Sequence, residues 1–207
     1  WTRYKLSNKK DAAALYVGIL PVLFGYFIPT IYMIYTYIIN IYRIDYGNFF
    51  ESLINTLFLG GIVALVCSLI SIIINYSQRF SKNIFSIYMK KLINLGYAIP
   101  GVVIALGVIF FIMGLDQILD YLIINKIIIS STLIGLILAL SIRLISLSNN
   151  SIDSGLDKIS KSIDDASRMI GRRYSTTYFR IIIPQINLSI FAGIFLVMVD
   201  TMKELPI

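Results

Sequence analysis

Charge-free runs of apolar residues follow one another along this chain, and polar residues gather in the segments between them. Five runs stand out, at residues 12–42, 52–78, 92–115, 127–142 and 181–199. A bilayer core about 30 Å thick needs roughly 20 helical residues to cross it, and lipid offers no partners to unpaired backbone amides. The pattern therefore predicts an all-α, polytopic membrane helical bundle of five spans. The fourth run is short, so we expect its helix to continue past Arg143, whose side chain can reach the interface.

Two of the runs contain small residues or proline that affect how their helices pack. The second run contains Gly60, Gly61 and Ala64, a small-residue patch that favours the close approach of another helix. The third contains Pro100 and Gly101 in mid-span, where irregular backbone is tolerated only against protein or a water-filled cavity. Pro100 and Gly101 are therefore candidates for lining a transport pathway, with a simple packing kink as the alternative.

The segment between the fourth and fifth runs, residues 150–184, has mixed polarity and the marks of two short helices. Its apolar residues recur at helical spacing, at Ile152, Leu156, Ile159, Ile163, Ala166 and Ile170. Ser162, with Asp165 three residues on, suits a capping-box start, and Gly171 suits a left-handed helix end. A second helix is expected over residues 172–180, with Pro184 in the first turn of the fifth span. Such a hairpin fits a partner's groove or, alternatively, rests on lipid headgroups.

Composition and charge agree with a membrane protein. Of the 207 residues, 57% are hydrophobic, against roughly 45–50% in a soluble domain. The net charge of +7 would suit nucleic acid, but most basic residues lie before the first run, between the second and third, and between the fourth and fifth. The other two connections hold only Arg43 and Lys126. This alternation follows the positive-inside rule and predicts a cytoplasmic N-terminus, a cytoplasmic 150–184 segment, the lipid bilayer as partner and no nucleic acid.

The sequence offers little to a catalytic or metal site. It has no histidine, and its one cysteine, Cys67, lies inside the second run. We find no nucleophile–base pair and therefore predict no enzyme, no bound metal and no bound cofactor. A secondary transporter or channel would need ionisable groups near the middle of the membrane. The first four runs contain none, and the fifth has them only at its end, which disfavours that alternative.

Three stretches resemble the transmembrane subunit of binding-protein-dependent ABC importers. Residues 165–184 resemble the EAA loop, at whose spacing this chain has Asp165, Ala166, Ser167, Gly171, Ile181 and Pro184. Residues 95–107 resemble a Gly-Tyr-Ala-Pro-Gly run, and residues 199–206 an Asp-x-Met-Lys-Glu-Leu-Pro ending, of the iron(III)-type permeases, which are related to thiamine permeases. Asp165, Ser167 and Ile183 depart conservatively from the usual Glu, Ala and Leu.

This resemblance implies an ABC importer type I permease fold with five of an expected six spans in this half. Residues 1–51 would be an N-terminal cytoplasmic segment with the first transmembrane helix. Residues 52–207 would be the permease domain, incomplete at its C-terminus, with a cytoplasmic coupling hairpin at residues 150–184. We expect the chain to be most of the C-terminal half of a longer protein.

The resemblance also implies a transport subunit of the bacterial inner membrane that uses ATP only through its partners. A dimer of separate ABC ATPase subunits would dock on the six residues of the EAA-like loop, and Gly171→Val would abolish transport. An extracytoplasmic binding protein would deliver the substrate, and a second permease half, fused or separate, would complete the pathway. Ferric iron is the implied substrate. Thiamine, phosphonate, sulfate and polyamine stay open, because no iron-ligand set is visible.

Three charged residues, Asp200, Lys203 and Glu204, lie at the end of the fifth run. The helix from Pro184 to Asp200 would be about 24 Å long, which places this cluster near the outer face of the membrane. Ionisable groups in spans are candidates for function. We therefore take these three residues as pathway or gate candidates that pair with another helix or meet the docked binding protein, with interfacial anchoring as the alternative.

Overall fold

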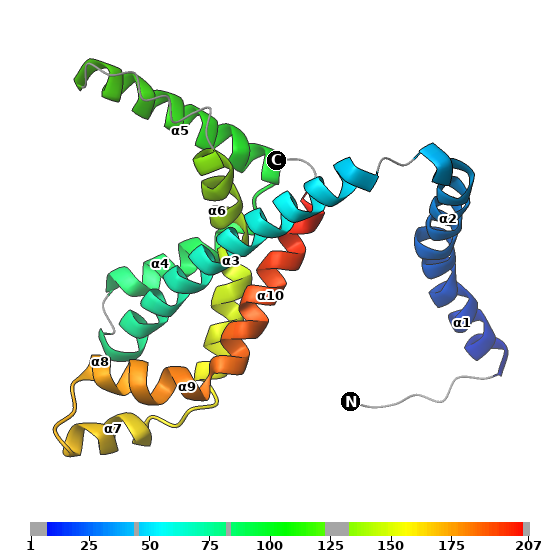
Figure 1. The fold of residues 1–207 in the computed structure, drawn as a ribbon. Helices are drawn as coiled ribbons and strands as arrows, with labels where there is room; N and C mark the ends of the chain where they lie inside the picture. Colours follow the sequence, from blue (N-terminus) through cyan, green and yellow to red (C-terminus); the bar gives the residue numbers. More distant parts are fainter. Residues whose placement is uncertain (1–7, 44–45, 82–83, 123–132, 205–207) are drawn as a thin grey trace. The chain divides into compact units, whose positions relative to one another are not determined.

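The computed structural model of this chain describes residues 8–43, 46–81, 84–122 and 133–204, and every regular element in these ranges is helical (Figure 1). Packing divides the chain into two units, Trp1–Glu51 and Ser52–Ile207. The helix α3 (Tyr46–Ser81) begins in the first unit and lies mostly in the second. The prediction of an all-α chain is confirmed for the described residues.

Residues 8–43 of the first unit are helical throughout, with a local change of geometry. Helix α1 (Asn8–Val22) passes through the π-helical segment η1 (Leu23–Phe27) into α2 (Ile28–Asn40), and the 3₁₀ turn η2 (Ile41–Arg43) follows. Pro29 lacks an N–H, and its ring would collide with the carbonyl of Gly25 in a regular α-helix. The wider π turn around Gly25 suits this proline, as helix irregularities commonly do.

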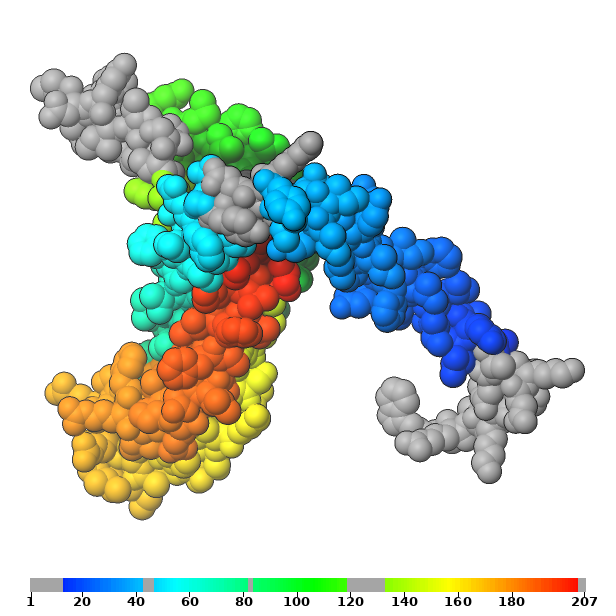
Figure 2. Space-filling model, turned by 45° about the vertical axis from the view of Figure 1, so that its right-hand side comes forward, coloured from blue at the N-terminus to red at the C-terminus, as the bar shows by residue number. Residues whose placement is uncertain are grey.

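The second unit is a helical bundle with a hairpin at one end. After α3 its elements are α4 (Ile84–Gly96), α5 (Gly101–Leu122), α6 (Leu133–Leu156), α7 (Ser162–Met169), α8 (Tyr174–Thr177), the π-helical η3 (Tyr178–Ile182), α9 (Ile183–Gln185) and α10 (Asn187–Lys203). Helix α6 packs against α4, α5 and α10. The segment from α7 to α9, yellow to orange in Figure 2, forms one end of this unit.

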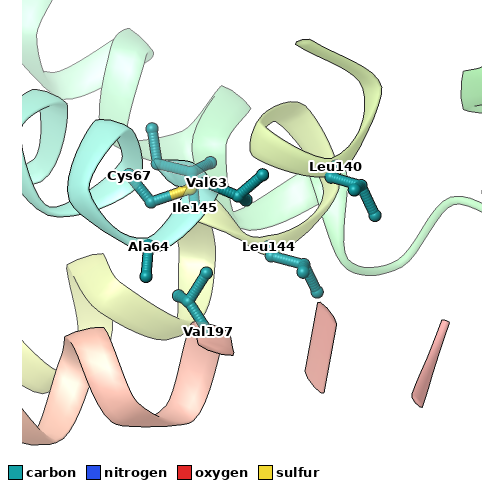
Figure 3. Close-up of a cluster of buried hydrophobic side chains, with 7 residues drawn as sticks. All are labelled: Val63, Ala64, Cys67, Leu140, Leu144, Ile145 and Val197. Atoms are coloured by element: carbon teal, nitrogen blue, oxygen red, sulfur yellow. The ribbon is translucent and has the colours of Figure 1, made fainter. Parts of the chain in front are cut away.

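The core of the bundle lies where α3, α6 and α10 meet (Figure 3). Its fully or nearly buried members are Val63, Ala64, Cys67, Leu140, Leu144, Ile145 and Val197. In lipid, close packing stabilises such a seam more than the hydrophobic effect does, so small residues at the contact matter. A Cβ on Gly60 would meet Met198 Cγ at 3.5 Å, whereas one on Gly61 would meet nothing within 4 Å. The small-residue patch therefore packs against α10 through Gly60 and Ala64.

A row of polar side chains joins α3 to α6 inside this otherwise apolar bundle. The hydroxyls of Ser68 and Ser148 lie 3.1 Å apart, and Asn75 Nδ2 donates to Asn149 Oδ1 at 2.9 Å. All four residues are buried. Interhelical hydrogen bonds of this kind are worth about 0.6 kcal/mol each in membrane bundles, with larger values in some cases. They fix the register of α3 against α6 by pairing donors with acceptors.

The described residues contain four helices that are long and apolar enough to cross a membrane: Ala13–Asn40, Gly47–Ser81, Gly101–Ile118 and Leu133–Leu156. A fifth candidate consists of Tyr174–Gln185 and Asn187–Lys203, which meet at a bend of 73°. The polytopic membrane fold is therefore confirmed, with up to five spans. Three details of the predicted spans are wrong.

The third run does not form one helix. Helix α4 ends at Gly96, and α5 begins at Gly101 after an irregular stretch. Proline disfavours the helical conformation in the residue before it, so the helix breaks ahead of Pro100 and restarts after it, with Val103 N–H donating to Pro100 O at 3.0 Å. Pro100 and Gly101 therefore lie at the beginning of a span and not in its middle.

The fourth helix extends much further than predicted. Helix α6 continues to Leu156, so Arg143 lies inside the candidate span and not at its edge. The expectation that the first four spans hold no ionisable group near the middle of the membrane is wrong for this reason. Arg143 Nε lies 3.1 Å from Glu204 Oε1 at the end of α10, and both side chains are largely buried. An opposite charge at this distance compensates for placing an arginine in a span.

The fifth helix begins later than predicted. Pro184 lies in α9, before the 73° bend, and α10 begins at Asn187. Proline at this position cannot pair with the carbonyl one turn earlier, and the π-helical η3 comes directly before α9. At Ile186 the backbone leaves helical geometry, with φ −102° and ψ 13°. Pro184 therefore belongs to the hairpin and not to the first turn of the span.

Candidate functional site

The hairpin at the end of the second unit has the predicted order of helix, turn and helix. Helix α7 runs to Met169, and the continuous helical segment Tyr174–Gln185 returns beside it (Figure 1). The periodic apolar stretch is interrupted at residues 157–161, because α6 ends at Leu156. Ile152 and Leu156 therefore pack in the bundle's second core cluster, whereas Ile163 lies on α7.

Gly171 forms the turn between the two helices. Its φ is +77°, a left-handed conformation that costs other residues roughly 1–2 kcal/mol. Gly171 N–H donates to Arg168 O at 2.8 Å, and Arg172 N–H donates to Ser167 O at 3.1 Å. These two bonds make a Schellman motif, which satisfies the last carbonyls of α7. The predicted left-handed stop is confirmed.

The start of α7 differs from the predicted capping box. The helix does begin at Ser162, but Lys161 occupies the N-cap position and no side chain caps it. The Ser162 hydroxyl lies instead 2.8 Å from the hydroxyl of Ser160. Asp165, the expected acidic partner, is exposed, and the neighbouring Asp164 is the buried one. The capping-box interpretation is therefore wrong, because Ser162 lies one position inside the helix.

The buried Asp164 accepts a hydrogen bond from Arg79, which lies near the end of α3. Arg79 Nε is 2.8 Å from Asp164 Oδ2, and the two side chains are only 9% and 12% exposed. The same guanidinium donates to the carbonyls of Leu156, Ile159 and Ser160 at 3.3–3.4 Å. These carbonyls lie at the end of α6 and in the turn after it, where a helix terminus leaves acceptor capacity for side-chain donors. Leu156 O and Ser160 O each also accept one backbone N–H. We call this group the Arg79 clasp.

The returning helix has its own anchor on α3. Tyr178 is fully buried, and its hydroxyl donates to Ile72 O at 3.1 Å. Its ring packs edge-on against Tyr76, with centroids 5.1 Å apart. The hydroxyls of Ser167 and Thr177 lie 2.6 Å apart and join the two helices of the hairpin. The hairpin is thus fixed to the membrane bundle at the Arg79 clasp and at Tyr178.

Sequence reasoning missed these anchors. Arg79 counted only as one of the basic residues of a connection, and Asp164 was passed over beside Asp165. Tyr178 lies in the helix predicted over residues 172–180, but it was not singled out as a buried anchor. Contacts between residues about 85 positions apart leave no periodic signal in a sequence, since periodicity reports only neighbours on one helix. The local signal that existed was the pair of adjacent acids, of which α7 can bury one.

The outward side of the hairpin is apolar at its tip and basic around it. Met169 is 90% exposed and Ile170 is 79% exposed. Arg168 lies over the ring of Tyr174 at 5.0 Å. A cleft of about 500 Å³ between the two helices is lined by Ile163, Ala166, Ser167, Ile170, Arg172, Thr176, Arg180 and Ile181. Of the six expected coupling residues, Ala166, Ser167 and Ile181 share this cleft, Gly171 forms the turn, and Asp165 and Pro184 are exposed.

The pathway and gate candidates lie on other elements. Pro100 is exposed at the break between α4 and α5, and Gly101 is buried at the start of α5. At the end of α10, Lys203 Nζ pairs with Asp200 Oδ1 of its own helix at 3.0 Å. Glu204 reaches Arg143 of α6, as described above. The remainder of the Lys-Glu-Leu-Pro string, residues 205–206, lies outside the described residues.

Within the described ranges, no group of three or more His, Cys, Asp or Glu residues is arranged to hold a metal ion. A polar cavity of about 440 Å³ lies beside the Arg79 clasp and contains a second ion pair, Lys90 Nζ to Asp153 Oδ1 at 2.6 Å. This pair joins α4 to α6.

The sequence of this chain matches the model of a known family. The sequence model of the family described as "Binding-protein-dependent transport system inner membrane component" matches residues 67–207. The match includes the last part of α3, from Cys67 onward, all of α4 to α6, the whole hairpin and α10. Comparisons with curated proteins and with solved structures give no match. Because the matched region is well over half of the chain, the chain belongs to the family of inner membrane components of binding-protein-dependent transport systems.

Proposed function

We propose that this chain is the permease subunit of an ATP-driven ABC importer and that its hairpin docks on a separate ATPase subunit. Family membership makes the chain the membrane component of a transport system that depends on a binding protein. The observation that carries the docking proposal is the tip of the hairpin. The Gly171 turn leaves Met169 and Ile170 as two large, exposed apolar side chains at the end of the bundle.

The charge around this tip indicates the chemistry of the partner. Arg168, Arg172, Arg173 and Arg180 are exposed, and Asp165 is the exposed acid among them. Apolar anchors inside a charged rim are typical of a helix that enters a groove, and opposite charge on the partner raises specificity and the rate of association. The hairpin tip therefore fits an ATPase groove that has apolar residues at its floor and acidic residues around its rim.

A lipid surface would also attract basic and apolar side chains, but two features favour a protein partner. The cleft beside Ala166, Ser167 and Ile181 is a recess that a side chain can enter. The hairpin is also held to the bundle by the Arg79 clasp and by Tyr178. A rigid, recessed surface suits specific docking, whereas a helix that lies on headgroups needs neither feature.

The remaining assignments complete the importer. The distribution of basic residues puts the N-terminus and the hairpin in the cytoplasm, where ATP is present. An extracytoplasmic binding protein delivers the substrate, and a second permease half closes the pathway. Pro100, Gly101, Asp200, Lys203 and Glu204 are its pathway or gate residues. Ferric iron is the proposed substrate because residues 95–107 and 199–206 resemble the iron-type permeases.

The test is affinity purification of the full-length parent from gently solubilised membranes. We expect an ABC ATPase to co-purify, and the substitution Ile170→Asp to remove it while the membrane protein still inserts. Ile170→Leu, which keeps a large apolar side chain at the same exposed position of the tip, is the matched control. A parent that purifies alone and transports in vesicles without ATP would overturn the proposal in favour of a channel or secondary transporter. Uptake of radiolabelled ferric iron, with thiamine, phosphonate, sulfate and polyamine as competitors, tests the substrate.

A further inference from the structure

We propose that Arg79 is the positioning residue that passes movement of the hairpin to the membrane helices. This inference rests on the proposed function, since it assumes that an ATPase moves α7. The inference names a physical connection between the docking site and the bundle. Asp164 on α7 contacts the guanidinium of Arg79, which also contacts the end of α6 and belongs to α3.

The geometry of the clasp supports this role. Each of the three nitrogens of the guanidinium makes at least one hydrogen bond: Nε to the carboxylate of Asp164, Nη1 to Leu156 O, and Nη2 to Ile159 O and Ser160 O. The planar, delocalised group holds these partners in fixed directions. If α7 shifts, either α6 and α3 shift with it or the hydrogen bonds of Arg79 break. These bonds are charge-assisted and therefore stronger than neutral ones.

The Arg79 clasp also lies beside the non-helical connection between α6 and α7. Residues 157–161 join α6 to α7 by turns, with bonds such as Ile159 N–H to Leu156 O at 3.0 Å. Turns of this kind bend more readily than helices. Arg79 joins α6 to α7 across this connection through its hydrogen bonds to both. The Arg79 side chain is buried, so water does not readily replace these hydrogen bonds. The returning helix is tied separately to α3 through Tyr178, so the hairpin reaches the bundle at two points that can be tested one at a time.

A neighbouring ion pair provides a matched control. Lys90 and Asp153 line the same polar cavity as Arg79, and their side chains are 28% and 31% exposed. Their pair joins α4 to α6 and does not include α7. Loss of this pair removes a charge interaction at a similar place in the bundle without opening the joint between α6 and α7.

The experiment uses the full importer, with its co-purified ATPase and its binding protein, in proteoliposomes. It compares wild type, Arg79→Lys, Asp164→Asn and Lys90→Gln. Three quantities are measured: the amount of bound ATPase, the acceleration of ATP hydrolysis by the loaded binding protein, and radiolabelled iron taken up per ATP hydrolysed. We expect both clasp variants to keep their ATPase but to lose about tenfold in transport per ATP, a typical size for coupling between sites. Lys90→Gln should stay within about twofold of wild type, as expected for a partly exposed pair.

The outcomes separate this inference from the proposed function. A wild-type chain that binds no ATPase overturns the proposed function itself. A wild-type importer that couples normally, with clasp variants that transport as much per ATP, overturns the inference alone. A clasp variant that lowers only the yield and the melting temperature, with unchanged transport per ATP in the assembled fraction, shows a merely structural role and also overturns it. If Arg79→Lys does not fold, Asp164→Asn decides, because it keeps an oxygen acceptor for Arg79 and removes only the charge.

Discussion

Gly171 is the residue at which the backbone of the hairpin requires glycine. Its φ of +77° favours glycine, and a Cβ there would meet no neighbour within 4 Å. Strain, and not crowding, is therefore the cost of replacing it. We expect Gly171→Val to cost roughly 1–2 kcal/mol at this turn, to misplace Ile170, and to abolish uptake while the protein still inserts. Uptake in cells, with the membrane content measured by blotting, checks this prediction.

Asparagine provides the control for Gly171→Val, because it visits the left-handed region more readily than other residues. Gly171→Asn should retain most of the uptake that Gly171→Val loses. Equal loss in both variants would show that side-chain size at the tip matters, and not backbone conformation. Normal uptake by Gly171→Val would count against the coupling role of the hairpin.

The charged residues at the end of α10 differ in their ion-pair partners and in their exposure. Glu204 faces Arg143 across two helices, and both side chains are largely buried. Lys203 pairs within its own helix and is 68% exposed. Removing Glu204 leaves a charged donor without compensation, so we expect Glu204→Gln to lower stability by roughly 1–3 kcal/mol. Lys203→Met should change stability far less, as exposed pairs do.

Thermal unfolding in detergent, followed by size-exclusion chromatography, compares these two variants. Similar melting temperatures for Glu204→Gln and Lys203→Met would show that the contact with Arg143 carries no stability. Uptake measured on the same variants addresses a separate question. A loss of transport by Lys203→Met that Lys203→Arg does not share would assign Lys203 a role in the pathway through its charge.

At the scale of elements, Tyr178 holds the returning helix of the hairpin on α3. Tyr178→Ala would remove a fully buried ring, a change that costs about 3–5 kcal/mol for large aromatic side chains, together with the hydrogen bond to Ile72 O. We expect the hairpin to loosen and trypsin to cleave faster after Arg172 and Arg173. Tyr178→Phe keeps the ring and loses about 1 kcal/mol, so its cleavage should remain close to that of wild type. Equal cleavage of all three proteins would contradict the anchoring role.

The elements that sequence predicted well are those set by local chemistry. The stop of α7 at Gly171 depends on residues within one or two turns, and it was found. The start of α7 was placed within one residue, although its cap was wrong. The irregular backbone at Pro100 and Gly101 was expected, but its place at the beginning of a span and the late start of α10 were missed. Unbroken hydrophobicity shows that a run is buried or in lipid, but it does not show where the helix bends. Arg143 was misplaced for a related reason, because its partner Glu204 is distant in sequence.

At the scale of the whole molecule, α10 separates the hairpin from Glu204, which lie at its two ends. The hairpin precedes α10 and Glu204 follows it. Seventeen helical residues correspond to about 25 Å, so the hairpin and the Arg143–Glu204 pair are separated by most of a bilayer core. An ATPase at the hairpin and a binding protein at the far end would therefore act on the same helix from its two ends. This arrangement requires the hairpin and Glu204 to face different compartments.

Labelling of introduced cysteines tests that requirement. The native Cys67 is fully buried in α3, so it should give little background with a membrane-impermeant maleimide. We expect Met169→Cys, at the exposed tip, to react in inverted vesicles and to stay unlabelled in right-side-out spheroplasts. Lys126→Cys, in a connection that the basic residues assign to the other side, should show the reverse. Labelling of Met169→Cys in spheroplasts would put the hairpin outside the cell, where no ATP-hydrolysing partner could reach it, and the coupling proposal would fail even if the helices pack as described.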